Sequence, residues 1–165
     1  MIDDLMSIPL KPHRYPDSCY DDHFCLKPPA MLWVALLYLG RSVALLCANA
    51  VGRFAGVDEA ALASLHAFWS PEALIPAAII VPVFLAMLWR SPTAPPAVRR
   101  IWQNGRIIML AAAGVDGLLC VRALLAHSTQ ETELVQTLGG LCVDVYLLAY
   151  IVFSRHVRDS FAEFP

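Results

Sequence analysis

Three charged residues, Arg41, Asp116 and Asp144, lie inside long apolar stretches of the sequence. Each falls near the middle of its own stretch, so the three would sit at a similar depth in a membrane. A lone charge at the bilayer centre costs at least about 2.5–3.5 kcal/mol, and such residues therefore turn toward neighbouring helices and find partners. The planar guanidinium of an arginine binds two carboxylates at once and keeps its charge. We therefore expect Arg41 to lie between Asp116 and Asp144.

This buried polar cluster, defined as Arg41, Asp116 and Asp144, supports two hypotheses. In the first it is a structural clamp that determines which helices touch and in what register. In the second, one aspartate is a proton or cation site, because two carboxylates around one arginine leave a negative charge for a bound proton or cation to neutralise. Polar groups between membrane helices often hold those helices together, which favours the clamp.

The N-terminal tail contains side chains that are able to bind metals, at His13, Cys19, His23 and Cys25. Their spacing lacks the paired C-x-x-C or H-x-x-x-H geometry that holds a tetrahedral ion. The sequence also lacks a glycine-rich phosphate loop, a nucleophile elbow and a haem-attachment motif. We therefore predict no metal site, no cofactor and no catalytic residue.

The composition is that of a membrane protein. Hydrophobic residues make up 58% of the 165 residues, and the mean hydropathy is +0.58, which exceeds what a soluble fold of this size buries. Charged residues make up only 16%, against about a quarter in soluble domains. The net charge of -2 provides no overall basic field, which excludes nucleic-acid binding. The lipid bilayer is the expected partner of the apolar surface.

Four apolar runs reach the roughly 20 residues that a helix needs to cross about 30 Å of hydrocarbon. They cover residues 30–51, 71–90, 106–126 and 134–153. Residues 57–69 place leucine and aromatic residues after two acidic ones and predict a short helix on the membrane surface. The sequence thus predicts an all-α fold, a polytopic four-helix bundle over residues 30–153. A lead-in at 1–29 and a tail at 154–165 flank it.

Two further patterns concern the third and fourth helices, one at the start of the third helix and one beside the two aspartates. Val98 and Trp102 share one helical face opposite Arg99 and Arg100, so the third helix is expected to begin near Pro96, before the apolar run. Small residues flank the two aspartates, at Ala113 and Gly117 in the third run and at Gly139 and Gly140 in the fourth. Such residues let helix backbones approach closely.

The distribution of basic residues predicts the orientation of the chain. Cytoplasmic loops of membrane proteins are enriched in lysine and arginine. One side of the predicted membrane receives Lys11, Arg14, Lys27, Arg90, Arg99, Arg100, Arg106, Arg155 and Arg158. The other side receives Arg53 alone, among several acidic residues. Both termini and the second loop are therefore expected in the cytoplasm, most simply in a bacterial inner membrane.

The entry to the first apolar run combines Tyr20-Asp21-Asp22, Cys25-Leu26-Lys27-Pro28-Pro29 and Leu32-Trp33, followed by Arg41 inside the run. Over residues 20–41 the sequence resembles a family of bacterial inner-membrane proteins typified by YfeZ. The resemblance implies a helical, polytopic chain of similar length with an arginine in its first span. It implies no activity, because the family is one of unknown function.

Three classes of function compete. The leading hypothesis is a non-enzymatic accessory, assembly or structural component, because the loops are too short to build a catalytic domain. Its helices would pack against a second copy or against a membrane-protein partner. The alternative is a small oligomeric proton- or cation-coupled transporter or channel that uses Asp116 or Asp144. A membrane enzyme has the least support, since His66, His127 and Glu133 are scattered candidates.

Overall fold

The computed structural model describes residues 15–20, 25–58, 71–126 and 131–164. These residues form helices and no strand, and Tyr20 and Leu26 form an isolated bridge. In chain order the helices are η2 (Asp17–Cys19), α1 (Ala30–Leu39), α2 (Arg41–Phe54), η3 (Pro71–Ala73), α4 (Leu74–Leu88), α5 (Pro96–Gln103), α6 (Gly105–Leu125), α7 (Glu131–Phe153) and α8 (Arg155–Ala162). The predicted all-α fold is confirmed for this part of the chain.

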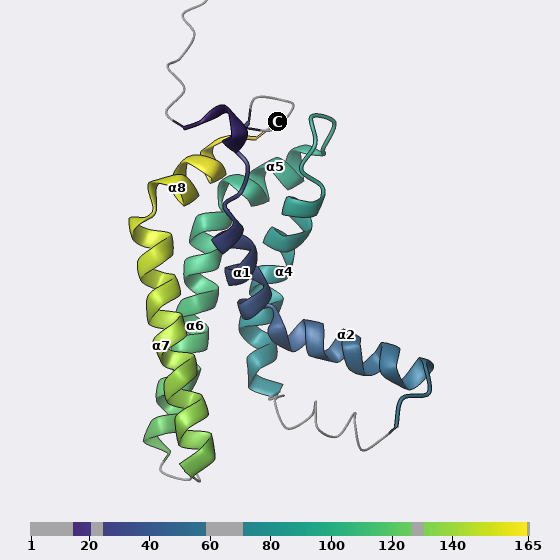
Figure 1. Cartoon of the computed structure of the whole chain (residues 1–165), viewed down its shortest axis with the longest axis vertical. Coiled ribbons are helices and arrows are strands. Elements are labelled where there is room, and N and C mark those ends of the chain that lie inside the picture. The colour runs from purple at the N-terminus through teal and green to yellow at the C-terminus, as the bar shows by residue number, and fades with distance from the viewer. Residues whose placement is uncertain (1–14, 21–24, 59–70, 127–130, 165) are drawn as a thin grey trace, which may run out of the picture.

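Three long helical segments form the body of the molecule. α6 packs extensively against both α4 and α7, and α1 contacts α4 and α6 (Figure 1). The segments Pro71–Leu88, Gly105–Leu125 and Leu134–Phe153 have mean hydropathies of 2.0, 2.0 and 1.6. Each is long and apolar enough to cross a membrane. The second, third and fourth predicted runs are therefore helices of spanning length.

Apolar side chains cover the outside of this bundle as well as its core. Leu36, Ile80 and Met109 are at most 1% exposed and pack between the helices. Leu118 and Val135 are 67% and 71% exposed on the outer surface. A helix that is apolar on all sides needs an apolar environment on the side that its neighbours do not cover. This arrangement is the one expected of helices surrounded by lipid.

The first predicted span is not one straight helix. α1 and α2 meet at Gly40 with a bend of 69°, and α2 leaves the bundle sideways (Figure 1). A Cβ on Gly40 would lie 3.0 Å from the carbonyl oxygen of Leu36, a close approach that glycine accommodates best. The span predicted over residues 30–51 is therefore two helices set at an angle, a feature that hydropathy does not report because it measures apolar length and not local backbone geometry.

One end of the bundle carries a packed cap, formed by residues 15–20 and 25–29, α5 and α8. Trp102 of α5 is fully buried, and its indole nitrogen donates hydrogen bonds to the carbonyl oxygens of Ser160 (3.0 Å) and Glu163 (3.1 Å). Gly105 lies against the ring of Phe161, and any Cβ at this position would overlap that ring. α8 is therefore held against the ends of α5 and α6.

The cap also joins the two ends of the described chain. The backbone nitrogen of Leu26 donates to the Glu163 carboxylate (2.8 Å), and the Tyr15 hydroxyl donates to Asp159 (2.9 Å). Arg90, just after α4, donates to the carbonyl oxygens of Leu26 and Glu163. The regions predicted as a lead-in and a tail thus pack together against the second loop.

Two details of the predicted helices also differ in the structure. The helix that begins at Pro96 ends at Gln103, and α6 begins separately at Gly105, so the expected single helix is two. The amphipathic pattern is confirmed, since Val98 and Trp102 are buried. Of the predicted surface helix at 57–69, residues 59–69 lie outside the described part of the chain.

Candidate functional site

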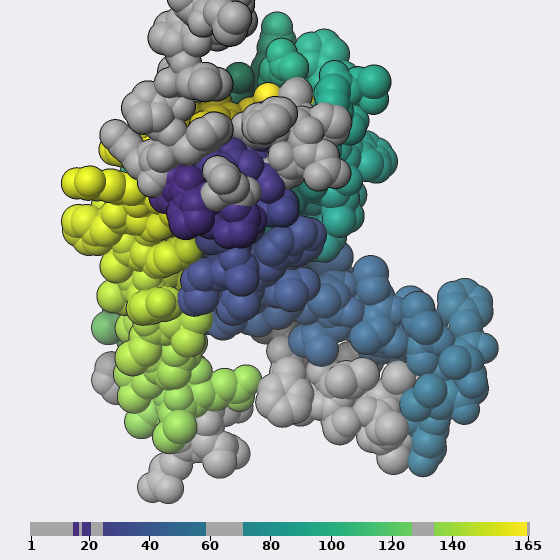
Figure 2. All heavy atoms as spheres, turned by 45° about the horizontal axis from the view of Figure 1, so that its top comes forward, coloured from purple at the N-terminus to yellow at the C-terminus, as the bar shows by residue number. Residues whose placement is uncertain are grey.

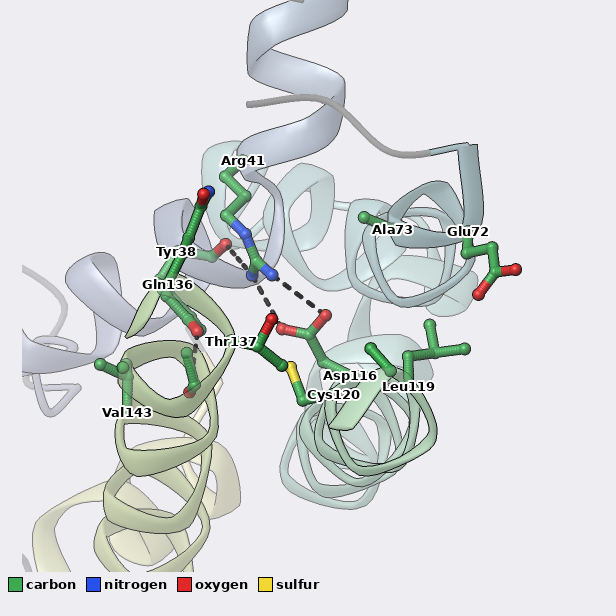
Figure 3. A pocket seen from close by; sticks show the side chains of 13 residues that line it. Tyr38, Arg41, Glu72, Ala73, Asp116, Leu119, Cys120, Gln136, Thr137 and Val143 are labelled. Carbon is green, nitrogen blue, oxygen red and sulfur yellow. Dashed lines mark hydrogen bonds and ion pairs between the residues drawn. The ribbon is translucent and has the colours of Figure 1, made fainter. Parts of the chain in front are cut away.

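Arg41 is the first residue of α2, directly after the bend, and its side chain reaches the middle of α6. Its two terminal nitrogens donate to the two carboxylate oxygens of Asp116, at 2.8 and 3.1 Å (Figure 3). This bidentate geometry is the strongest form of an arginine–carboxylate pair. The Asp116 side chain is only 3% exposed, whereas that of Arg41 is 36% exposed. The pair therefore neutralises a carboxylate that the bundle has removed from solvent.

The same guanidinium stabilises the end of α1. One terminal nitrogen also donates to the carbonyl oxygen of Tyr38 (3.1 Å), in the last turn of that helix. The last carbonyls of a helix lack intrahelical partners and carry partial negative charge. The guanidinium also lies 4.4 Å from the centroid of the Tyr38 ring, a cation–π geometry. Arg41 thus links the bend between α1 and α2 to α6.

Asp144 of α7 is completely buried, and it interacts electrostatically with both Asp116 and Arg41. Its Oδ2 accepts a long hydrogen bond from the Cys120 thiol (3.8 Å), while its Oδ1 has no hydrogen-bond partner among the described residues. The structure thus brings the three predicted residues into one region, where the guanidinium of Arg41 donates its two carboxylate hydrogen bonds to Asp116. The position of Arg41 between the two aspartates stays a prediction.

Small residues bring α6 and α7 together at the aspartates. A Cβ on Gly117 would lie 3.7 Å from the Cβ of Asp144, and one on Gly140 would lie 3.6 Å from the Cys120 sulfur. The Tyr38 hydroxyl donates to the carbonyl oxygen of Gly140 (3.2 Å) and so joins α1 to α7. Gly139, in contrast, faces open space. The packing prediction therefore holds for Gly117 and Gly140.

A pocket of about 420 Å³ adjoins the ion pair (Figure 3). Its walls come from the end of α1, the start of α2, η3, the second half of α6 and the first half of α7. It is lined by Tyr38, Arg41, Glu72, Ala73, Asp116, Leu119, Cys120, Ala123, Gln136, Thr137, Gly139, Gly140 and Val143. The space-filling view shows a hollow below α1, between α7 and α2 (Figure 2).

The bend in the first segment explains why this pocket exists. α1 has 10 residues and rises about 15 Å at 1.5 Å per residue. α2 then turns away from the bundle. α2 contacts α4 but turns away from the parts of α6 and α7 that lie beyond the bend (Figure 1). Sequence reasoning missed the pocket because it assumed a straight first span.

The other candidate residues do not form a second site in the described part of the chain. His13, His23, His66 and His127 lie outside that part, and it contains no group of three or more metal-binding side chains. Glu133 falls where side chains are not described. Cys19 and Cys25, in the described N-terminal segment, form no disulfide there. The predicted absence of a metal site stays a prediction for the whole chain.

A family model described as a protein of unknown function (DUF2919) matches residues 15–163, which is most of the chain. The chain belongs to the DUF2919 family. No curated protein and no solved structure matches it. The DUF2919 match begins at Tyr15 and ends at Glu163, and both residues make hydrogen bonds within the cap. The cap thus lies inside the DUF2919 region together with the apolar helices.

Proposed function

We propose that the chain is a multi-pass protein of the bacterial inner membrane and works as a non-enzymatic accessory, assembly or structural component. The observation that carries this proposal is the bidentate pair between Arg41 and Asp116, together with the bond from Arg41 to the carbonyl oxygen of Tyr38. These contacts use the charge of the arginine to hold a bend in place, which is the behaviour of a clamp. The resemblance of residues 20–41 to the proteins typified by YfeZ supports the same location.

The proposed topology has four crossings with both termini in the cytoplasm. Residues 15–20 and 25–29, the second loop and α8 meet at the cap, whereas α4 begins at the opposite end of the bundle. This arrangement of the ends supports a crossing by the bent segment between residues 29 and 71. The cap end carries Arg99, Arg100, Arg155 and Arg158, as the cytoplasmic side should.

Cysteine labelling tests this topology. In a variant without the five native cysteines, Thr93→Cys in the second loop should resist a membrane-impermeant thiol reagent in intact cells. Ala126→Cys, at the far end of α6, should react. Both native side chains are exposed, so burial does not explain a difference between them. Labelling of Thr93→Cys in intact cells would contradict the proposed orientation.

The transporter alternative has one specific observation in its favour, the buried and unpartnered Oδ1 of Asp144. A buried carboxylate is unfavourable unless it is neutralised, so we infer that this group holds a proton or a cation. Under the accessory hypothesis the proton is static. Under the alternative it exchanges across the membrane.

The substitution Asp144→Asn separates the two hypotheses. A neutral carboxyl group and an amide accept the same hydrogen bond from Cys120, so the free energy of unfolding should change by less than about 1 kcal/mol. Vesicles reconstituted with the native protein should show no proton or cation flux above that of empty vesicles. A flux that Asp144→Asn abolishes in a folded protein would instead establish the transporter.

A further inference from the structure

α7 lies at one edge of the bundle, with α6 as its main neighbour (Figure 1). Its inner side contains Asp144, Leu147 and Ile151, which are at most 1% exposed. Only 17% of its apolar stretch is buried inside the bundle, against 33% for Pro71–Leu88 and 28% for Gly105–Leu125. α7 is therefore the least covered of the three long helices, and most of its surface faces outward.

The side of α7 opposite the buried residues forms one continuous uncharged face. We define this outer face of α7 as Val135, Leu138, Cys142, Tyr146, Ala149 and Phe153, all of which are exposed. The six residues follow one another at intervals of three or four, which places them on one side of the helix. They extend along almost the whole length of the segment Leu134–Phe153.

Tyr146 places a polar group on this face, deep in the proposed membrane. It is 56% exposed, and its hydroxyl makes no hydrogen bond to the described residues. Its ring stacks on that of Tyr150, with 6.5 Å between the centroids, but this contact does not involve the hydroxyl. Tyr146 precedes the end of α7 by seven residues, about 10 Å along the axis, and helical side chains point toward the N-terminus, here away from that end. The hydroxyl therefore lies among lipid tails, which offer no hydrogen-bond partner.

We propose that the outer face of α7 binds the same face of a second copy, so that the protein is a homodimer in the membrane. Copies with the same topology have parallel α7 helices, and a two-fold axis between them places both Tyr146 residues at the same depth. A hydroxyl donates one hydrogen bond and also accepts, so the two Tyr146 side chains satisfy each other. A face without charge also meets its own copy without repulsion.

This inference rests on the proposed membrane location, and it deepens the proposed function by naming the surface and the partner. The labelling of Thr93→Cys and Ala126→Cys tests the topology separately. If that labelling follows the expected pattern and the tests below fail, the dimer is wrong and the proposed function still stands.

Oxidative cross-linking of the full-length protein in membranes tests the dimer. Cys142 lies at the centre of the outer face and is exposed. A variant that keeps Cys142 and carries serine at the other four cysteine positions has one thiol per copy. A disulfide forms only between Cβ atoms that come within about 4 Å of each other. Copper phenanthroline, with dioxygen as the oxidant, should therefore join two copies through Cys142.

Val143→Cys, in a protein whose native cysteines are all serine, is the matched control. Val143 is the next residue and is 39% exposed, but it points about 100° away around the helix. We expect Cys142 to cross-link at least tenfold faster than Val143→Cys. Equal rates at the two positions, or no cross-linking of Cys142 in a protein that circular dichroism shows to be folded, would overturn the proposal. A product that joins Cys142 to a different protein would also overturn it.

The dissociation constant of the dimer in lipid vesicles, measured by energy transfer between labelled copies, tests the contacts. Ala149→Phe should raise it at least tenfold, because a ring at the centre of the face holds the two helices apart. Ala111→Phe, at an exposed alanine of α6, should leave it within twofold. Tyr146→Phe should raise it about threefold, the usual effect of one hydrogen bond between membrane helices. Native affinity in Ala149→Phe or Tyr146→Phe, or a tenfold loss in Ala111→Phe, would contradict the proposed interface.

Discussion

Replacing Arg41 with leucine should destabilise the folded protein by about 3–5 kcal/mol, the usual effect of leaving one partner of a buried ion pair alone. The substitution removes both bonds to Asp116 and the bond to the carbonyl oxygen of Tyr38. It leaves a carboxylate that is 3% exposed without a partner. Titration of the detergent-solubilised protein with SDS, followed by circular dichroism, measures the loss.

Asp116→Leu and the double variant control for this interpretation. Asp116→Leu should cost less than Arg41→Leu, because the arginine that remains is partly exposed and still donates to Tyr38. The double variant Arg41→Leu/Asp116→Leu should recover most of the stability, since no buried charge is left. Additive losses in the double variant would show that the two side chains do not act as a pair.

Replacing Trp102 with alanine should have an effect of similar size, about 3–5 kcal/mol, because it empties a large space in the core. The indole is fully buried, and its ring centroid lies 4.7 Å from that of Phe161. Its nitrogen donates hydrogen bonds to two carbonyl oxygens at the end of α8. We expect α8 to detach before the apolar helices separate. Hydrogen exchange should therefore rise first in residues 155–163.

Trp89→Ala is the matched control for the cap. Trp89 follows α4 near the same end of the bundle, but 64% of it is exposed. Its removal should change the free energy of unfolding by only about 0.5 kcal/mol. If Trp102→Ala is equally mild, or if α8 exchanges no faster than in the native protein, the cap does not stabilise the fold as we describe.

The pairing of Arg41 shows where sequence reasoning reaches its limit. The cost of a charge in an apolar run predicts that Arg41 must find a carboxylate, and Asp116 and Asp144 were the two within reach by depth. The choice between them depends on the direction in which the arginine side chain leaves its helix. That direction changes at Gly40, where the 69° bend makes Arg41 the first residue of a new helix.

The cap was missed for a different reason. Residues 155–162 form an amphipathic helix whose Val157 and Phe161 are buried, but eight residues contain too few turns to stand out beside the long apolar runs. The surface that they cover is formed by α5 and α6, far away in the sequence. A short amphipathic pattern of this kind predicts a packed helix only once the surface that it packs against is known.

The sequence by itself determined that this protein is helical, with apolar runs of spanning length and charges that must turn inward. These features follow from the cost of exposing backbone and charge to hydrocarbon, which depends on residue type and run length alone. Only the tertiary structure decided the bend at Gly40, the choice of Asp116 as the partner of Arg41, the cap and the pocket. Each of these depends on contacts between residues distant in the chain, because packing geometry and not composition selects among alternatives of similar hydropathy.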